Sequence, residues 1–189
     1  MRLFVAINLP DALREEIHDA VAPLREDGVP ARWVKASSYH VTMKFIGEVR
    51  PDDGNAMEEM LRRCVSGYRP VAVGLEEVGA FPSLRRPRVI WLGVTPTPQL
   101  RALKHDLEHA YARLGIERET RAFRPHVTLG RVDDDADAGD FRDFESLARE
   151  IGVEAQFTAS HLDLMRSRLR PDGPEYSLEA RVALSPGDG

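Results

Sequence analysis

The sequence predicts an α+β fold of two facing lobes within one domain, residues 1–189. Two observations lead to this prediction. Segments with alternating apolar residues are interleaved with segments that have helical periodicity. In addition, the order strand, helix, His-Val-Thr strand, helix occurs twice, once around His40 and once around His126. We therefore expect each lobe to be built around one of these two histidines.

The first repeat is expected to span residues 2–66. Residues 2–9 alternate between apolar and other side chains, which indicates a strand. A helix opens at Pro10-Asp11, has apolar residues at helical spacing, and ends before Gly28 and Pro30. Residues 38–49 are rich in Val, Thr, Phe and Ile and predict the strand of His40, which is followed by a helix over residues 52–66.

The second repeat has the same order with a hairpin placed before it. The expected elements are the hairpin 70–95, a helix whose apolar face is Leu100, Leu103, Leu107, Ala110, Tyr111 and Leu114, the strand 121–132 that contains His126, a short helix over 141–151, and two final strands over 153–169 and 175–184. Pro and Gly at 171–174 predict the turn between these last strands. The acidic loop 133–140 and the tail 185–189 are expected to be solvated.

Composition limits the possible functions. The net charge of −5 argues against a protein that coats long nucleic acid by neutralising phosphates, although a local positive pocket for a phosphorylated end remains compatible with it. Cys64 is the only cysteine, which excludes an internal disulfide and a cysteine metal cluster. Cys64 is expected to be a buried structural thiol. Without a long apolar span or a recognisable signal peptide, the chain is expected to be soluble and cytoplasmic.

Two short motifs carry the chemistry: His40-Val41-Thr42-Met43 and His126-Val127-Thr128-Leu129. In a strand, residues i and i+2 point to the same face, so each histidine is expected to lie beside its threonine. A lone histidine in a strand is most often structural, but two copies with the same neighbours favour a functional pair. Two imidazoles can supply the base and the acid that hydrolysis of a cyclic phosphodiester needs, and the two hydroxyls suit the phosphate oxygens.

The sequence resembles the two-histidine (2H) phosphoesterase superfamily, in particular the RNA 2′,3′-cyclic phosphodiesterases that are also described as 2′-5′ RNA ligases. The resemblance rests on the segments 2–10, 40–49, 79–94, 123–132 and 164–178. It implies a bilobal fold in which antiparallel sheets line a central cleft with helices outside. It also implies hydrolysis of RNA 2′,3′-cyclic phosphate ends to 2′-phosphomonoesters without a metal or cofactor, and it leaves reversible 2′-5′ RNA ligation open.

The resemblance further implies roles for individual residues. His40 is expected to be the proton donor and His126 the proton acceptor, with Thr42, Thr128 and Arg131 binding the phosphate. Phe45 is expected to stack on the base. Phe45 and Arg131 each follow their histidine by five residues, and period-two geometry places that offset on the opposite face. Either the strands twist or end before that point, or both residues are structural.

Other candidate sites have simpler interpretations. His105 and His109 have the i,i+4 spacing of metal ligands but share their helix face with charged residues, so a solvated face is expected there and, equally, for His18 and His161. The aspartates of loop 133–140 lack the Gly and Glu of a calcium loop, since those positions hold Ala138 and Phe144. The basic turn Arg85, Arg86 and Arg88 either guides an RNA backbone or protects a strand edge.

Two alternatives to an RNA-end phosphodiesterase remain open. The same chemistry suits small cyclic phosphates, such as a cyclic nucleotide or an ADP-ribose cyclic phosphate. In the other alternative the chain is a non-catalytic module that binds RNA ends, in which the histidines only form hydrogen bonds. RNA with a cyclic phosphate end is the expected partner; a monomer without an obligate protein partner or a membrane partner is expected.

Overall fold

The structure is a computed structural model that describes residues 1–170 and 173–184. Its strands are β1 (Arg2–Asn8), β2 (Ala31–Trp33), β3 (His40–Glu48), β4 (Val71–Ser83), β5 (Arg86–Val94), β6 (His126–Val132), β7 (Gln156–Ala159), β8 (His161–Arg170) and β9 (Gly173–Ala183). Its helices are α1 (Asp11–Ala20), α2 (Ala22–Glu26), α3 (Gly54–Val65), α4 (Pro98–Ala112) and α5 (Phe144–Glu150), with short 3-10 turns η1 (Ala36–Ser38), η2 (Pro51–Asp53) and η3 (Ala138–Phe141). Of the predicted turn 171–174, residues 171–172 lie outside the described residues, as does the tail 185–189.

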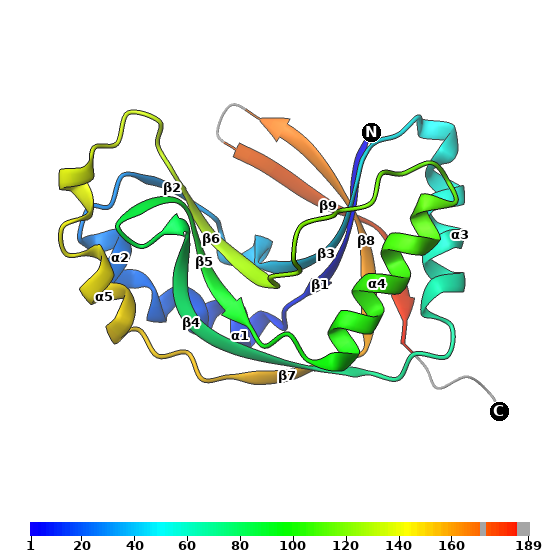
Figure 1. Cartoon of the computed structure of the whole chain (residues 1–189), viewed down its shortest axis with the longest axis horizontal. Helices are drawn as coiled ribbons and strands as arrows, with labels where there is room; N and C mark the ends of the chain where they lie inside the picture. Colours follow the sequence, from blue (N-terminus) through cyan, green and yellow to red (C-terminus); the bar gives the residue numbers. More distant parts are fainter. Residues whose placement is uncertain (171–172, 185–189) are drawn as a thin grey trace.

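The strands form a curled antiparallel sheet, which confirms the predicted α+β class (Figure 1). Their order is β7-β4-β5-β6-β3-β1-β8-β9, and β2 pairs with β6 outside this path. One half of the sheet therefore surrounds β3, and the other surrounds β6. The halves meet at the antiparallel pair Val41↔Val127, one residue after each histidine. The two motifs lie at the centre of the molecule for this reason.

The helices cover the outer side of the sheet and leave the other side open (Figure 1). α3 and α4 pack together at the β3 end, where α4 contacts β3 and α3 contacts β9. α1, α2 and α5 lie at the β4–β5 end, where α5 contacts β4 and α2 contacts α5. α4 thus follows the β4–β5 hairpin in sequence but covers the other half. α1 likewise follows β1 but lies at the β4–β5 end, whereas α3 and α5 stay with the half of the strand that precedes them.

The C-terminal strands differ from the prediction in one respect. The segment expected as one strand over 153–169 is divided at Ser160 into β7 and β8. β7 pairs with β4 in one half, whereas β8 pairs with β1 in the other. β7 forms one edge of the sheet, and β8 lies between β1 and the opposite edge strand β9. The division is therefore explained by long-range pairing, which local periodicity does not reveal.

The apolar face predicted for α4 is buried at Leu100, Leu103, Leu107 and Tyr111. Leu114 is the exception: it lies beyond the end of the helix and is 36% exposed. Buried apolar side chains of both halves form one continuous cluster under the sheet. Burial of this kind is the main contribution to stability in a chain with one free cysteine.

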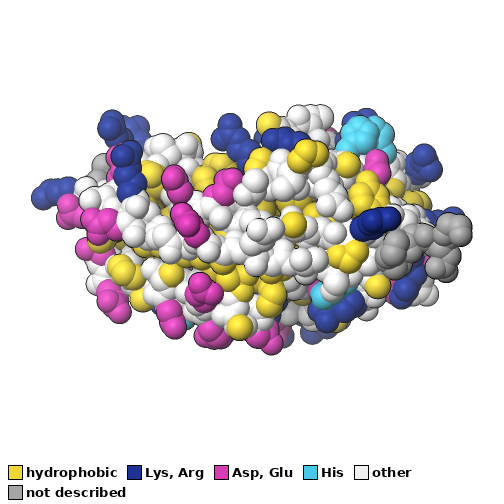
Figure 2. All heavy atoms as spheres, turned by 90° about the horizontal axis from the view of Figure 1, so that it is seen from below, with side chains coloured by type: hydrophobic (Ala, Val, Ile, Leu, Met, Phe, Trp, Pro, Cys, Tyr) yellow, Lys and Arg dark blue, Asp and Glu magenta, His cyan; other side chains and the backbone are white. Residues whose placement is uncertain are grey.

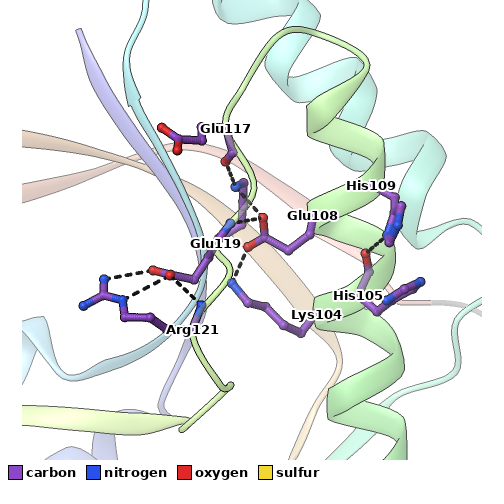
Figure 3. Close-up of polar contacts among 8 residues, drawn as sticks. Lys104, His105, Glu108, His109, Glu117, Glu119 and Arg121 are labelled. Atoms are coloured by element: carbon purple, nitrogen blue, oxygen red, sulfur yellow. Dashed lines mark hydrogen bonds and ion pairs between the residues drawn. The ribbon is translucent and has the colours of Figure 1, made fainter.

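A buried polar cluster joins β3 to α4 and to the connection that follows α4, on the helix side of the sheet (Figure 3). Lys44 on β3 is 2% exposed and donates hydrogen bonds to Glu108 Oε2 on α4 and to the Glu117 carbonyl, both at 2.6 Å. Glu108 also accepts from Lys104 and from the backbone N–H of Glu119, the latter at 3.0 Å. Burial raises the pKa of Glu108, but these hydrogen bonds outweigh it and hold the pKa below its usual value. Lys44 therefore holds the connection that leads from α4 to β6.

The outer surface agrees with the net negative charge. In the face seen in Figure 2, acidic side chains gather toward one end, and basic side chains are scattered among apolar ones without forming a continuous basic area. Among the described residues, no helix has the length and apolar content needed to cross a membrane.

Candidate active site

The four predicted polar side chains lie on the open face of the sheet. Val41 and Val127 are fully buried on the helix side, while His40, Thr42, His126 and Thr128 are partly exposed. In the antiparallel register Val41↔Val127, His40 is opposite Thr128, and Thr42 is opposite His126. The two imidazoles and two hydroxyls therefore form a compact group across the seam between the halves.

A bulge brings the residues at offset five onto this same face, which corrects the period-two prediction. Ala6 pairs with Thr42 and Val5 with Lys44, so Met43 has no partner in β1. In the other half Trp91 pairs with Thr128 and Ile90 with Gly130, so Leu129 is unpaired in the same way. Each strand then has two consecutive buried residues, and the alternation is reversed beyond them.

The bulges explain the positions of Phe45 and Arg131. Phe45 is 64% exposed, and its ring lies 6.4 Å from that of Phe4, which in turn lies 5.0 Å from the His40 ring. Arg131 is exposed on β6 and its charge acts on His126. Both therefore share the face of the histidines, as the family resemblance implies and as simple strand geometry did not predict.

Aromatic residues surround both histidines in a similar way. Tyr176 on β9 meets the His40 ring edge-on at 5.1 Å between centroids. Phe81 on β4 meets the His126 ring edge-on at 5.2 Å, with Trp91 alongside. Sequence reasoning missed these residues, because their proximity results from strand pairing between distant segments.

The Trp91 indole lies over Gly79, its partner on β4. A Cβ at Gly79 would come within 2.1 Å of the ring, so this position has room for glycine only.

The backbone fixes the tautomer of both imidazoles. His40 Nδ1 is 2.7 Å from the Ser38 carbonyl oxygen, and His126 Nδ1 is 2.7 Å from the Arg124 carbonyl oxygen. A carbonyl only accepts, so in each ring Nδ1 carries the proton. Nε2 is then left for chemistry in both residues. The same contact to residue i−2 in both halves is a further sign of their correspondence.

Both imidazoles favour their neutral form in the free protein. Burial lowers the pKa of His40 to about 4; the hydrogen bond to Ser38 opposes this shift, while Arg14 and His126 add to it. Burial also lowers the pKa of His126, with Arg131 contributing in the same direction. Each ring is thus ready to accept a proton at neutral pH, whereas a proton donor must first be charged. An anion bound beside the rings would favour their charged forms and so raise these pKa values.

The other predicted residues lie away from this group. His105 and His109 stack on α4 with ring centroids 4.0 Å apart, and the described residues contain no cluster of three or more possible metal ligands. His161 begins β8 and lies 3.9 Å from the buried Asp163, and both it and His18 are partly exposed.

The remaining candidates have structural environments as well. Burial raises the pKa of the Cys64 thiol to about 11, which keeps it protonated at neutral pH. In the basic turn, Arg85 pairs with Glu145 at 3.3 Å and Arg88 with Asp134 at 4.0 Å. Asp137 and Asp140 of the acidic loop form a capping box at η3.

Comparison with known proteins agrees with this geometry. The family model described as the 2′-5′ RNA ligase superfamily matches residues 9–170. The chain belongs to this superfamily. Among its relatives in the 2′-5′ RNA ligase superfamily, a protein of Methanothermobacter thermautotrophicus named RNA 2′,3′-cyclic phosphodiesterase is 31% identical over 182 residues, covering 94% of this chain and 95% of the relative. A protein of Thermotoga maritima with the same name is 30% identical, covering 94% of this chain and 92% of the relative.

Solved structures confirm the fold expected of the 2′-5′ RNA ligase superfamily. Escherichia coli LigT complexed with 3′-AMP has a TM-score of 0.76 and 28% identity, covering 97% of this chain and 98% of that one. A Thermus thermophilus protein, TT0787, has a TM-score of 0.82 over the whole of both chains, at 23% identity. The resemblance to the 2H phosphoesterases recognised in the sequence is thereby confirmed.

Proposed function

We propose that this chain hydrolyses RNA 2′,3′-cyclic phosphodiester ends to 2′-phosphomonoesters by acid–base catalysis that needs no metal. The observation that carries the proposal is the group of two Nε2 atoms and two threonine hydroxyls on one face of the sheet. The substrate class is supported by relatives that cover nearly the whole chain and are named RNA 2′,3′-cyclic phosphodiesterase.

In this mechanism the phosphate lies between the histidines. His126 Nε2 takes a proton from water as the water oxygen forms its bond to phosphorus. The bond from phosphorus to the ribose 3′ oxygen breaks, and His40 Nε2 protonates that oxygen. Thr42, Thr128 and Arg131 hold the non-bridging oxygens, and Phe45 stacks on the terminal base. In 2′-5′ ligation a 5′-hydroxyl replaces the water, so His126 takes its proton and His40 again protonates the 3′ oxygen; by microscopic reversibility the two roles are exchanged when the 2′-5′ bond is cleaved.

The proposal is tested with His40→Ala and His126→Ala on an oligonucleotide that ends in a 2′,3′-cyclic phosphate. Each variant is expected to lose roughly 10²- to 10⁴-fold in kcat, because each removes one proton transfer. His105→Ala, an exposed position on α4, serves as the control and is expected to keep full activity. Near-normal turnover by either active-site variant with unchanged thermal unfolding would overturn the proposal, and so would loss of activity in EDTA.

The assignment of donor and acceptor has its own test. A substrate with sulfur in place of the 3′ oxygen needs little help from an acid, since a thiol has a pKa near 8.5. His40→Ala is expected to recover most of its activity on this substrate, whereas His126→Ala is not. The opposite pattern would make His126 the proton donor and His40 the proton acceptor.

Two other functions are distinguished by the same assays. A strong preference for a nucleoside cyclic phosphate over an oligonucleotide would indicate a small-molecule phosphodiesterase. Tight product binding without turnover at any pH would indicate a module that binds RNA ends. We also expect a cytoplasmic monomer that needs no protein partner, which light scattering of the purified chain checks for the oligomeric state.

A further inference from the structure

A pocket of about 300 Å³ opens beside His40, at the end of β3 away from Phe45. Its lining includes Arg14 and Arg181 together with Tyr176 and Leu178. Tyr176 also packs against the His40 ring, so the pocket and the candidate active site share a wall. A ligand group bound here would be adjacent to the phosphate that His40 contacts.

A buried carboxylate organises the polar side of the pocket. Asp163 is fully buried and accepts two hydrogen bonds from the Arg181 guanidinium, at 2.9 and 3.0 Å. It also accepts from Asn8 Nδ2 at 2.6 Å, and Asn8 Oδ1 accepts from Arg14 Nη2 at 3.2 Å. This chain of contacts holds both guanidinium groups at the pocket wall. Because Arg181 compensates the negative charge of Asp163, the positive charge of Arg14 remains available to attract an anion.

Arg14 has hydrogen-bonding capacity left over. Its side chain is 14% exposed, and its Nε is buried with no hydrogen-bond partner among the described residues. Its carboxylate contact is Asp11 at 3.1 Å, which is 96% exposed and therefore weak in water. A guanidinium that lines a pocket and has no buried carboxylate partner of its own is well suited to a phosphate group, whose oxygens accept from planar Arg donors.

The position beside His126 that corresponds to this pocket carries a negative charge instead of a positive one. Asn8 is the strand partner of His40, and Gly93 is the strand partner of His126. The space over Gly93 holds Glu76, since a Cβ at Gly93 would come within 3.3 Å of Glu76 Oε2. A second anion is thus attracted at the His40 end and repelled at the His126 end.

We infer that this pocket binds a second phosphate group of the substrate, next to the cyclic phosphate, and that Arg14 is its main ligand with Arg181 alongside. The inference rests on the proposed function for the identity of the first phosphate. Leu178 and Tyr176 provide an apolar wall for the sugar or base attached to the second phosphate. The enzyme then distinguishes nucleotides that carry a second phosphate from those that carry only the cyclic one.

Equilibrium binding tests the pocket without relying on turnover. Adenosine 2′,5′-bisphosphate is expected to bind the wild-type chain at least about tenfold more tightly than adenosine 2′-monophosphate, as measured by calorimetry. Arg14→Met is expected to remove this difference. Leu178→Glu, which adds a carboxylate to the pocket without touching Asp163, is expected to remove it as well, whereas Leu178→Gln keeps it. Arg168→Met, an exposed arginine on β8 outside the pocket, is the control for a general loss of charge.

Turnover then identifies the source of the second phosphate. If it is the 5′ phosphate of the terminal nucleotide, adding that phosphate to adenosine 2′,3′-cyclic phosphate raises kcat/KM about tenfold in the wild type but not in Arg14→Met. If it belongs to a second strand, the ligation reaction prefers a 5′-hydroxyl dinucleotide over adenosine as acceptor, again only with Arg14 present.

The outcomes distinguish the assignment of the phosphate pocket from the proposed function. Equal binding of the two adenylates by wild type and Arg14→Met, with no Arg14-dependent preference in either reaction, overturns the pocket assignment even if cyclic phosphates are hydrolysed. Absence of hydrolysis with Arg14-dependent binding of the bisphosphate instead overturns the proposed function and leaves the pocket as a phosphate-binding site.

Discussion

Burial lowers the pKa of an imidazole and so disfavours the charged form that can donate a proton. Burial lowers the pKa of both histidines of this site. The pKa of His40 is lowered to about 4, so the ring is neutral at pH 7 in the free protein. An anion beside it stabilises the imidazolium and raises the pKa. By linkage, phosphate binding must then be accompanied by proton uptake at a pH between the free and bound pKa values.

Calorimetry checks this at pH 6.5. Binding of adenosine 2′-monophosphate is expected to take up close to one proton in addition to any proton that the ligand itself takes up. This uptake is measured as a dependence of the binding enthalpy on the ionisation enthalpy of the buffer. His40→Gln is expected to lose that uptake, and affinity in the wild type should increase as pH falls from 8 to 6.5. Binding that is independent of the buffer would show that the pKa of His40 stays low in the complex.

At the scale of single residues, the sequence predicted the two histidines and two threonines of the candidate site but not the residues around them. Paired His-Val-Thr motifs predicted the two histidines and their threonines, because period two within a strand is a local property. Phe4, Arg14 and Tyr176 were missed, since they lie in an apolar strand, a helix and a C-terminal hairpin and reach His40 only through long-range pairing. Arg14 has no local signal that separates it from the other helix arginines.

At the scale of elements, the matching bulges at Met43 and Leu129 decide which residues reach the site. Each reverses the alternation of its strand and so places Phe45 and Arg131 beside the histidines. The sequence could not predict this, because a bulge depends on the partner strand as well as on its own. The glycine opposite Trp91 has a similar effect, since it lets the indole lie flat on the sheet near His126.

Gly79→Ala tests this contact between elements. The added methyl group would come within 2.1 Å of Trp91, so the indole must move, and with it the aromatic wall beside His126. We expect kcat to fall at least about tenfold and the fold to be destabilised by roughly 1–3 kcal/mol, as overpacking usually does. Gly152→Ala, where the methyl group meets open space, is the matched control. Similar behaviour of the two variants in activity and urea unfolding would contradict the role of Gly79.

At the scale of the whole molecule, the halves depend on each other for burial. α4 follows one hairpin and covers the other half, and β7 and β8 are adjacent in sequence but complete different halves. The repeated element order allowed the two halves to be predicted. It could not reveal the exchange, because helix periodicity identifies a buried face but not the sheet that buries it.

Lys44 joins β3 to α4 and to the connection that leads on to β6, so its removal is expected to destabilise the fold. Lys44→Met leaves Glu108 buried with less compensation, and loss of one partner of a buried ion pair costs about 3–5 kcal/mol. Urea unfolding should remain a single transition, because each half buries elements of the other. Arg63→Met, which removes an exposed pair with Glu59, is expected to cost less than about 1 kcal/mol. Equal losses, or two separate transitions for Lys44→Met, would contradict this account.

The pairing of Val41 with Val127 has a kinetic consequence. The two imidazoles are each one residue from that pair, so their separation is set by the hydrogen-bonded ladder of one sheet. A hinge between domains would have to close before such groups could cooperate, and the closure would lose entropy in every cycle. In the proposed function the positions of His40 and His126 are therefore set before the substrate arrives, and no hinge has to close around it.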